Sequence, residues 1–286
     1  MSIHFNKIGL AIAFSPTSQA LLKEAASWAV QFNAQLVLMH VGKHGAEEEA
    51  KMRELINSTD LAGREPIIAW REGRPVEEIL KICSDENIDL LLAGALKKEN
   101  ILQNYIGTVA RKIMRKADCS VLMIQNPNAE RKSIQNIVVN AEDSPYIEQA
   151  IEAACHIGQM ENTQWVHIAR ELKLLGLALS ASEHCTENEY HDNMQGMVRE
   201  ELDEVEKILA RIPHSKLKVN IKVLSGKAGF ELARFAERKN ADLLIVGAPA
   251  RRFSLFDRVF PHDLEYVFAN LPCNLLMVKP RKQTHG

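Results

Sequence analysis

The chain has 286 residues, of which 46% are hydrophobic and 25% are charged, and its formal net charge is −2. This length is about twice that of a typical single domain, and the composition is that of an ordinary globular protein. The near-zero charge excludes a general electrostatic attraction to nucleic acid or to anionic membranes. The N-terminus lacks a signal-peptide pattern, and the five cysteines form no CxxC pair. We therefore expect a cytoplasmic protein that binds neither nucleic acid nor membranes.

The first half of the chain alternates short apolar runs with helical patterns. The apolar runs predict strands over 7–14, 35–41, 66–71, 89–93 and 120–124, and helical periodicity predicts helices over 20–29, 47–55, from 75 onward and over 107–117. Such alternation is typical of parallel strands covered by helices on both faces. Right-handed crossovers then predict a doubly wound α/β sheet of five strands.

The second half repeats the first. Residues 72–80 recur as 225–233, residues 88–95 as 241–248, and residues 118–124 as 272–278. A fourth block matches 36–41 to 163–168 at an offset of 127, which gives His40 and His167 the same strand position, where we expect buried histidines with backbone partners. The spacing of these blocks predicts about 26 extra residues near 170–200 in the second copy. We expect domains over 1–127 and 132–282.

Four motifs carry a family resemblance. They are Ser15-Pro16-Thr17-Ser18, the strand end His40-Val41, Glu72-Gly73-Arg74-Pro75, and the segment Asp89 to Gly94. With their order and repetition, the chain resembles two universal stress protein domains in tandem. The resemblance implies the strand order 3-2-1-4-5 in each domain. It also implies an intramolecular pseudo-dimer in which 121–124 pairs with 275–278, while a further homodimer remains open.

In nucleotide-binding members of that family, a Gly-x2-Gly-x9-Gly-[Ser/Thr] loop after the fourth strand holds phosphates. Glycines let backbone N–H groups approach the phosphate oxygens, and the following helix N-terminus favours an anion. In the first copy, Lys97 replaces the middle glycine and either contacts phosphate or closes the loop. By resemblance, the backbone of Val41 would meet adenine. The candidate site for ATP or AMP is therefore Val41, Gly94, Lys97, Gly107 and Thr108.

Other positions depart from the family's pattern. Ala13 stands where the family has an acidic residue that contacts ribose or metal, and in the second copy either Asn140 or Glu142 takes that position. Pro249 and Pro261 remove backbone donors from the second loop. We therefore expect weak or absent ATP binding. In the plain structural alternative, the strand-end glycines only end strands and Gly107-Thr108 only begins a helix.

The remaining motifs are few. The chain has no Walker loop, no GxGxxG and no Gly-x-Ser-x-Gly, so no motif supports a catalytic kinase or hydrolase. His184, Cys185 and His191 are weak candidates for a zinc site, although a polar loop also collects such residues. The leucine-rich segment 172–179 predicts an extra packing element, a lid over an apolar ligand, or a dimer contact.

These observations favour a non-catalytic stress-response protein that acts by small-ligand sensing or partner contacts. One alternative is a slow ATPase that uses Gly94, Lys97, Gly107 and Thr108. Another is a binder of apolar compounds or lipid intermediates through the second domain. Nucleotide binding separates the first two hypotheses from the third.

Overall fold

The computed structural model describes residues 4–97, 104–127, 132–142, 144–172, 187–227, 229–248 and 262–279. In its first half, strands and helices alternate in the order β1 (Lys7–Ile12), α1 (Ser18–Gln31), β2 (Gln35–Val41), α2 (Ala46–Asn57), β3 (Ile67–Arg71), α3 (Pro75–Asp85), β4 (Leu90–Gly94), β5 (Leu96–Lys97), β6 (Asn104–Tyr105), α4 (Thr108–Lys116) and β7 (Ser120–Ile124). The predicted strands and helices of this half therefore exist, with ends that differ by a few residues.

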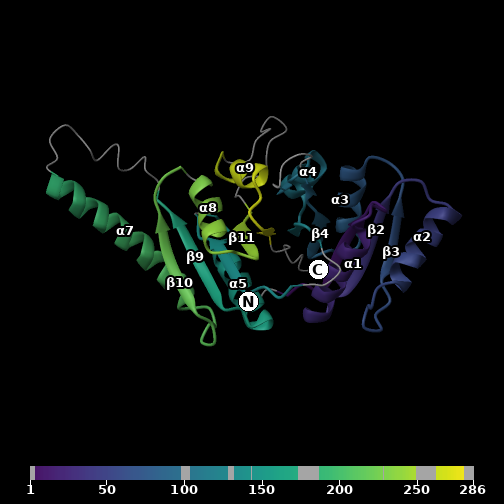
Figure 1. The fold of residues 1–286 in the computed structure, drawn as a ribbon, viewed down its shortest axis with the longest axis horizontal. Helices are drawn as coiled ribbons and strands as arrows, with labels where there is room; N and C mark the ends of the chain where they lie inside the picture. Colours follow the sequence, from purple (N-terminus) through teal and green to yellow (C-terminus); the bar gives the residue numbers. More distant parts are fainter. Residues whose placement is uncertain are drawn as a thin grey trace.

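The second half has the same alternation. Its elements are β8 (Asn136–Asn140), α5 (Ile147–Glu161), β9 (Trp165–Glu171), α7 (Glu187–Leu209), β10 (Val219–Leu224), α8 (Phe230–Arg238), β11 (Leu243–Gly247), α9 (His262–Ala269) and β12 (Asn274–Val278). Helix α7 is much longer than its counterpart α2 and extends away from the sheet (Figure 1). Among the described residues, no helix is long and apolar enough to cross a membrane.

Ten strands form one continuous sheet in the order β10-β9-β8-β11-β12-β7-β4-β1-β2-β3. Each half contributes five parallel strands in the order 3-2-1-4-5, and the two halves lie on either side of the β12–β7 contact (Figure 1). That contact is antiparallel and places Leu122 opposite Leu276. The predicted doubly wound domains and their pairing through the last strands are confirmed.

The join between the halves follows an approximate twofold symmetry. The N–H of Gln125, just after β7, donates to Asn274 Oδ1 at 2.7 Å. At the matching position after β12, the N–H of Lys279 donates to Ser120 Oγ at 3.0 Å. Pairing these two strands hides edges that would otherwise expose unpaired backbone groups.

Two apolar cores cover the two faces of the sheet, and each core runs through both halves. The first lies under α1, α2, α5 and α7 and includes Leu10, Leu38, Ile168 and Leu276. The second lies under α3, α4, α8 and α9. Neighbouring residues of a strand alternate between the two cores, as a sheet covered on both faces requires.

The proposed equivalence of His40 and His167 is wrong. Strand pairing matches Ile8 to Leu36 in the first half and Ile137 to Val166 in the second, and through β4 and β11 Ile8 corresponds to Ile137. The true offset in the second strand is therefore 130, so His40 corresponds to Arg170. At this offset Leu36 and Leu38 align with Val166 and Ile168, and the inferred insertion becomes three residues shorter. Because side chains alternate, this odd shift puts the two histidines on opposite faces.

Candidate functional site at the strand ends

The strand order reverses between the first and fourth strands of each half, that is, between β1 and β4 and between β8 and β11. The chain leaves these neighbouring strands toward opposite faces of the sheet. Doubly wound sheets bind ligands at this point, at the carboxyl ends of the strands. The residues that follow β1, β4, β8 and β11 therefore form the two candidate sites.

The first-domain phosphate loop begins and ends at two glycines. Leu96 of β5 pairs with Tyr105 of β6, so Gly94 and Gly107 lie equally far from this pair on the two arms of one hairpin. Gly107 is the N-cap of α4, and no side-chain hydrogen bond caps that helix among the described residues. The first turn of α4 also contains no acidic residue, and Thr108 is exposed. This end of α4 therefore suits an anion.

The structure describes the rest of that loop only in part. Residues 98–103 lie outside the described residues, as does the side chain of Lys97, so both roles considered for this lysine stay predictions. Just before α4, the N–H of Ile106 donates to Phe268 O of α9 at 3.0 Å. The start of α4 is thus anchored against the second half of the molecule.

Gly94 also has a packing role. A Cβ built on this residue would lie 3.1 Å from Leu21 Cδ1 of α1. The glycine therefore lets α1 approach the end of β4, which agrees with the plain structural explanation of this residue. Close approach does not exclude ligand binding, because the same absence of a side chain opens the strand end.

Val41 ends β2 and is half-buried. The N–H of Gln35 donates to Asn6 O on the β1 side, whereas the N–H of Gly42 donates to Arg71 O on the β3 side. Backbone groups alternate along a parallel strand, so those of Val41 face the β1 side. Ile12 is the last residue of β1, and the carbonyl of Val41 therefore faces the space beyond it.

A row of rings lies beside this first-domain strand end. His40 is buried, and its Nδ1 lies 3.0 Å from Ile12 O, which confirms the expected backbone partner. Its ring lies between Phe14 at 4.5 Å and Trp70 at 5.4 Å, and His44 stacks on Trp70 at 4.5 Å. This row was not predicted from the sequence, although aromatic residues at or just after neighbouring strand ends give a usable signal.

The second domain has a different arrangement at the equivalent place. Arg170 is 5% exposed and donates to Ala141 O, the counterpart of Ile12 O. It also pairs with Glu201 and, at 3.2 Å, with Glu204, both on α7. This buried guanidinium ties the long helix to the end of β9.

The switch point of the second domain is bridged by its own loops. Ser144 Oγ, after β8, donates to Ala248 O, after β11, at 2.8 Å. A Cβ on Gly247 would lie 2.6 Å from Ser144 Oγ, so only glycine leaves room for this bridge. The contact spans the gap in which a phosphate-binding loop would have to admit its ligand.

A carboxylate also occupies a helix N-terminus here. Glu171 corresponds to Val41, and its Oε1 accepts a hydrogen bond of 2.8 Å from the N–H of Gly229, the N-cap of α8. A negative charge at this end of a helix takes the place of an external anion. Glu142 follows Ala141 as Ala13 follows Ile12, which assigns the acidic position to Glu142 rather than Asn140.

His167 has no part in this site. It lies on the opposite face of the sheet, against Phe235 of α8 at 5.9 Å between ring centroids. Burial, together with the charge of Lys239, lowers the pKa of its imidazole below the usual 6.5. At neutral pH the side chain is therefore an uncharged core residue.

Several predicted positions lie outside the described residues. They are His184, Cys185, Pro249 and Pro261, while of His191 only the helical backbone is described. Among the residues that the structure does describe, no three potential metal-ligating side chains gather. The zinc hypothesis stays a prediction.

Fold and strand ends together define a tandem doubly wound α/β protein, in which a side-chain hydrogen bond bridges the strand-end loops of the second domain. The sequence profile of the Universal stress protein family matches residues 4–125 and again 133–279. The chain therefore belongs to the universal stress protein family and contains two of its domains.

Individual relatives are distant. Universal stress protein MJ0577 of Methanocaldococcus jannaschii is 22% identical over 162 residues, which cover 45% of this chain and all of that protein. Among solved structures, a functionally unknown protein, PA1789 from Pseudomonas aeruginosa PAO1, has a TM-score of 0.67 at 17% identity and covers 97% of this chain and 93% of its own. A universal stress protein from Archaeoglobus fulgidus has a TM-score of 0.65 at 15% identity, covering 97% and 99%. At these identities the structural likeness shows the fold alone.

Proposed function

We propose that this protein is a non-catalytic universal stress protein whose first domain senses a small anionic ligand and whose second domain makes partner contacts. ATP or AMP is the ligand class we favour for the first domain, with weak affinity. The second domain binds no nucleotide at its strand ends. The two domains thus have different tasks although they share one fold.

One contrast carries this proposal. The second-domain strand end is bridged by the Ser144–Ala248 hydrogen bond, and its Glu171 carboxylate caps α8. In the first domain, no described side chain caps α4, which begins at Gly107. A nucleotide would have to displace the Ser144–Ala248 bridge in the second half, whereas in the first half its phosphates would meet backbone donors at the start of α4.

The first-domain residues fit a nucleotide only in part. The start of α4 and the strand-end Gly94 suit phosphate, and the Val41 carbonyl faces the space beside it. Ala13, which is exposed, offers no acceptor for a ribose hydroxyl. Losing one hydrogen bond to a ligand costs about 1 kcal/mol, or roughly fivefold in affinity. This supports weak rather than absent binding.

Isothermal titration with ATP and with AMP, each with magnesium, tests the proposal. We expect one weak site per chain, lost in Gly107→Asp because a carboxylate at the start of α4 repels phosphate. Gly196→Asp is the matched control, since a Cβ there meets nothing within 4 Å on exposed α7. Two sites per chain would contradict the division of tasks, and so would binding that survives Gly107→Asp.

Phosphate release tests the non-catalytic part. We expect no release above the spontaneous rate when the chain is incubated with ATP. Steady release that Gly107→Asp abolishes would favour the slow ATPase and contradict this part of the proposal.

A further inference from the structure

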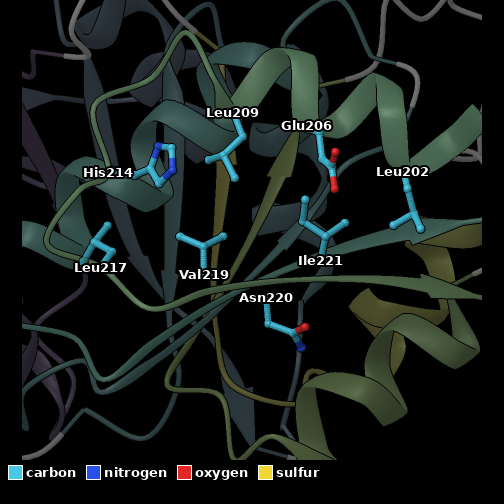
Figure 2. Close-up of a pocket in the computed structure, with 8 residues that line it drawn as sticks. All are labelled: Leu202, Glu206, Leu209, His214, Leu217, Val219, Asn220 and Ile221. Atoms are coloured by element: carbon cyan, nitrogen blue, oxygen red, sulfur yellow. The ribbon is translucent and has the colours of Figure 1, made fainter. Parts of the chain in front are cut away.

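A groove of about 520 Å³ lies between α7 and β10, the strand at the second-domain end of the sheet. Figure 2 shows Leu202 and Leu209 entering it from the helix and Val219 and Ile221 from the strand. Leu217 closes one end, and Glu206 and His214 supply polar side chains, whereas the side chain of Asn220 points to the other face of the sheet, toward His167 (Figure 2). Its volume falls in the range of about 300–1,000 Å³ typical of ligand sites.

The backbone of β10 adds hydrogen-bonding groups to this groove. The strand pairs with β9, and on its other side the described residues contribute no strand. The N–H of Val166 donates to Lys218 O, and the N–H of Leu172 donates to Leu224 O, so these two residues of the edge segment face β9. By alternation, the N–H and C=O groups of Val219, Ile221 and Val223 point away from the sheet.

The same two residues therefore supply both apolar side chains and outward-facing backbone groups. Val219 and Ile221 line the apolar groove and also present outward backbone donors and acceptors. A helix wall beside a free strand edge is the arrangement into which extended peptides add as a further strand. A lipid chain would cover the apolar side chains but leave those backbone groups unpaired, which is unfavourable.

Charge indicates what kind of peptide fits. Lys216, Lys218 and Lys222 are exposed along this edge, and none forms an ion pair with a carboxylate within the described part of the chain. Pairing two copies of the chain antiparallel through β10, centred on Asn220, would bring Lys218 of one copy opposite Lys222 of the other. Like charges placed opposite each other destabilise a strand pair. An acidic strand is favoured instead.

We propose that the α7–β10 groove binds an extended, acidic peptide segment of a partner protein as an added strand. Alternate apolar side chains of the segment enter the groove, and its acidic residues face the three lysines. The inference rests on the partner-contact part of the proposed function. It is independent of nucleotide binding by the first domain, which the same preparations measure separately.

The test uses the full chain and a defined probe, a fluorescein-labelled nonapeptide of alternating valine and glutamate with blocked ends. We expect saturable binding by fluorescence anisotropy that weakens as salt is added. Amide exchange of Val219, Ile221 and Val223 should slow at least tenfold in the complex. The same peptide with N-methylated valines cannot complete the ladder and should not bind.

Two variants separate strand addition from simple apolar contact. Val223→Pro removes one outward N–H while leaving the ladder to β9 intact, and Pro is tolerated on such an edge. Ile221→Asp places a charge in the groove. Each should weaken probe binding at least tenfold, with circular dichroism unchanged. Ile68→Asp, on the opposite edge strand β3 at 38% exposure, is the matched control and should bind the probe normally.

Several results would overturn the proposal. They are no binding at millimolar probe, binding without slowed exchange at the three amides, or exchange that is already slow in the free chain. Binding of a fluorescent fatty acid in the groove, with no binding of the peptide, would also overturn the proposal. So would amide exchange that slows with rising protein concentration in the absence of peptide, because this would indicate pairing of two copies of the chain. ATP titration of Val223→Pro keeps the two proposals apart. If this variant binds ATP as the unmodified chain does, a failure of peptide binding does not count against the first-domain proposal.

Discussion

The two strand ends of this molecule use the same backbone acceptor for different purposes. In the first half, Ile12 O meets the ring of His40. In the second half, the equivalent Ala141 O accepts from Arg170, which also holds two glutamates of α7. His40 in one half and Arg170 in the other thus meet the same backbone position, one within a row of rings and the other as an ionic anchor for a helix. Divergence between the halves lies in side chains at the strand ends rather than in topology.

The join between the halves shows the opposite behaviour. Ser120 and Asn274 begin the two central strands and accept equivalent hydrogen bonds from Lys279 and Gln125. Hydroxyl and amide oxygens serve the same role, so the approximate symmetry survives a change of residue. The region that holds the halves together thus stays symmetric, while the strand ends do not.

Breaking the symmetric join should have the largest effect. Leu276 is fully buried opposite Leu122 at the centre of the sheet. Leu276→Ala should lower the free energy of unfolding by ~4 kcal/mol, because a fully enclosed site relaxes little around the cavity. Urea denaturation measures this loss. Ile68→Ala, on the outer edge strand at 38% exposure, should cost less than ~1.5 kcal/mol. Equal losses at both positions would contradict the central role of the join.

Removing the ionic anchor should have the next largest effect. Arg170→Met keeps the aliphatic packing but leaves Glu201 and Glu204 without their buried cation. Those carboxylates are 25% and 64% exposed, so water compensates in part and we expect a loss of ~2–3 kcal/mol. Amide exchange in the last three turns of α7 should speed up.

A matched change separates this anchor from an ordinary surface pair. Arg211 pairs with Glu148 at 3.2 Å, and both side chains are largely exposed. Arg211→Met should therefore change the free energy of unfolding by less than ~1 kcal/mol and leave α7 exchange as it was. If both variants behave alike, Arg170 is not what holds the helix.

The strand-end glycines give a smaller and more local comparison. In Gly247→Ala the new Cβ would lie 2.6 Å from Ser144 Oγ, so the bridge to Ala248 must break or shift. We expect a loss of ~1–2 kcal/mol by thermal unfolding. Gly94→Ala meets the flexible end of Leu21 at 3.1 Å and should cost about half as much. Reversed magnitudes would show that the first-domain strand end is the more tightly packed one.

Much of the fold could be predicted because both halves of the chain carry the same pattern of strands and helices. Apolar runs set the strands, and the family resemblance supplied the order and the pairing of 121–124 with 275–278, which the sheet confirms. The register of the second strand was not predictable from its apolar pattern. Consecutive buried residues such as those around His40 and His167 offer no alternation, since both faces of the strand are covered. Only the pairing partners on each side fix the register.

The candidate site could be proposed in its sequence positions but not in its contacts. Gly94 and Gly107 were found from their spacing, and the structure places them on the two arms of one hairpin. The bridge from Ser144 to Ala248 and the capping of α8 by Glu171 were missed. Each joins residues more than fifty positions apart, and single polar side chains carry no periodic signal.

The smallest expected effect concerns pH at the contact between the halves on the α1–α5 side. His156 of α5 packs on Phe32 at 5.7 Å and beside His4 at 6.2 Å, and burial lowers its pKa below 6.5. The unfolded chain therefore binds a proton at His156 more readily than the folded chain does. The stabilisation that comes from keeping His156 neutral is complete above about pH 6.5 and is lost as the pH falls further.

Thermal unfolding at a series of pH values between 7.5 and 5.5 measures this loss, and the unfolding midpoint should fall as the pH is lowered. His156→Gln should reduce that slope without abolishing it, because the lowered pKa of His167 contributes with the same sign, whereas His44→Gln, at an exposed histidine, should leave it unchanged. Burial raises the pKa of neighbouring Glu152 above its usual 4.5, and its contribution has the opposite sign because it lowers stability as the pH rises. An unchanged slope in His156→Gln would therefore remove this histidine from the contact's pH response.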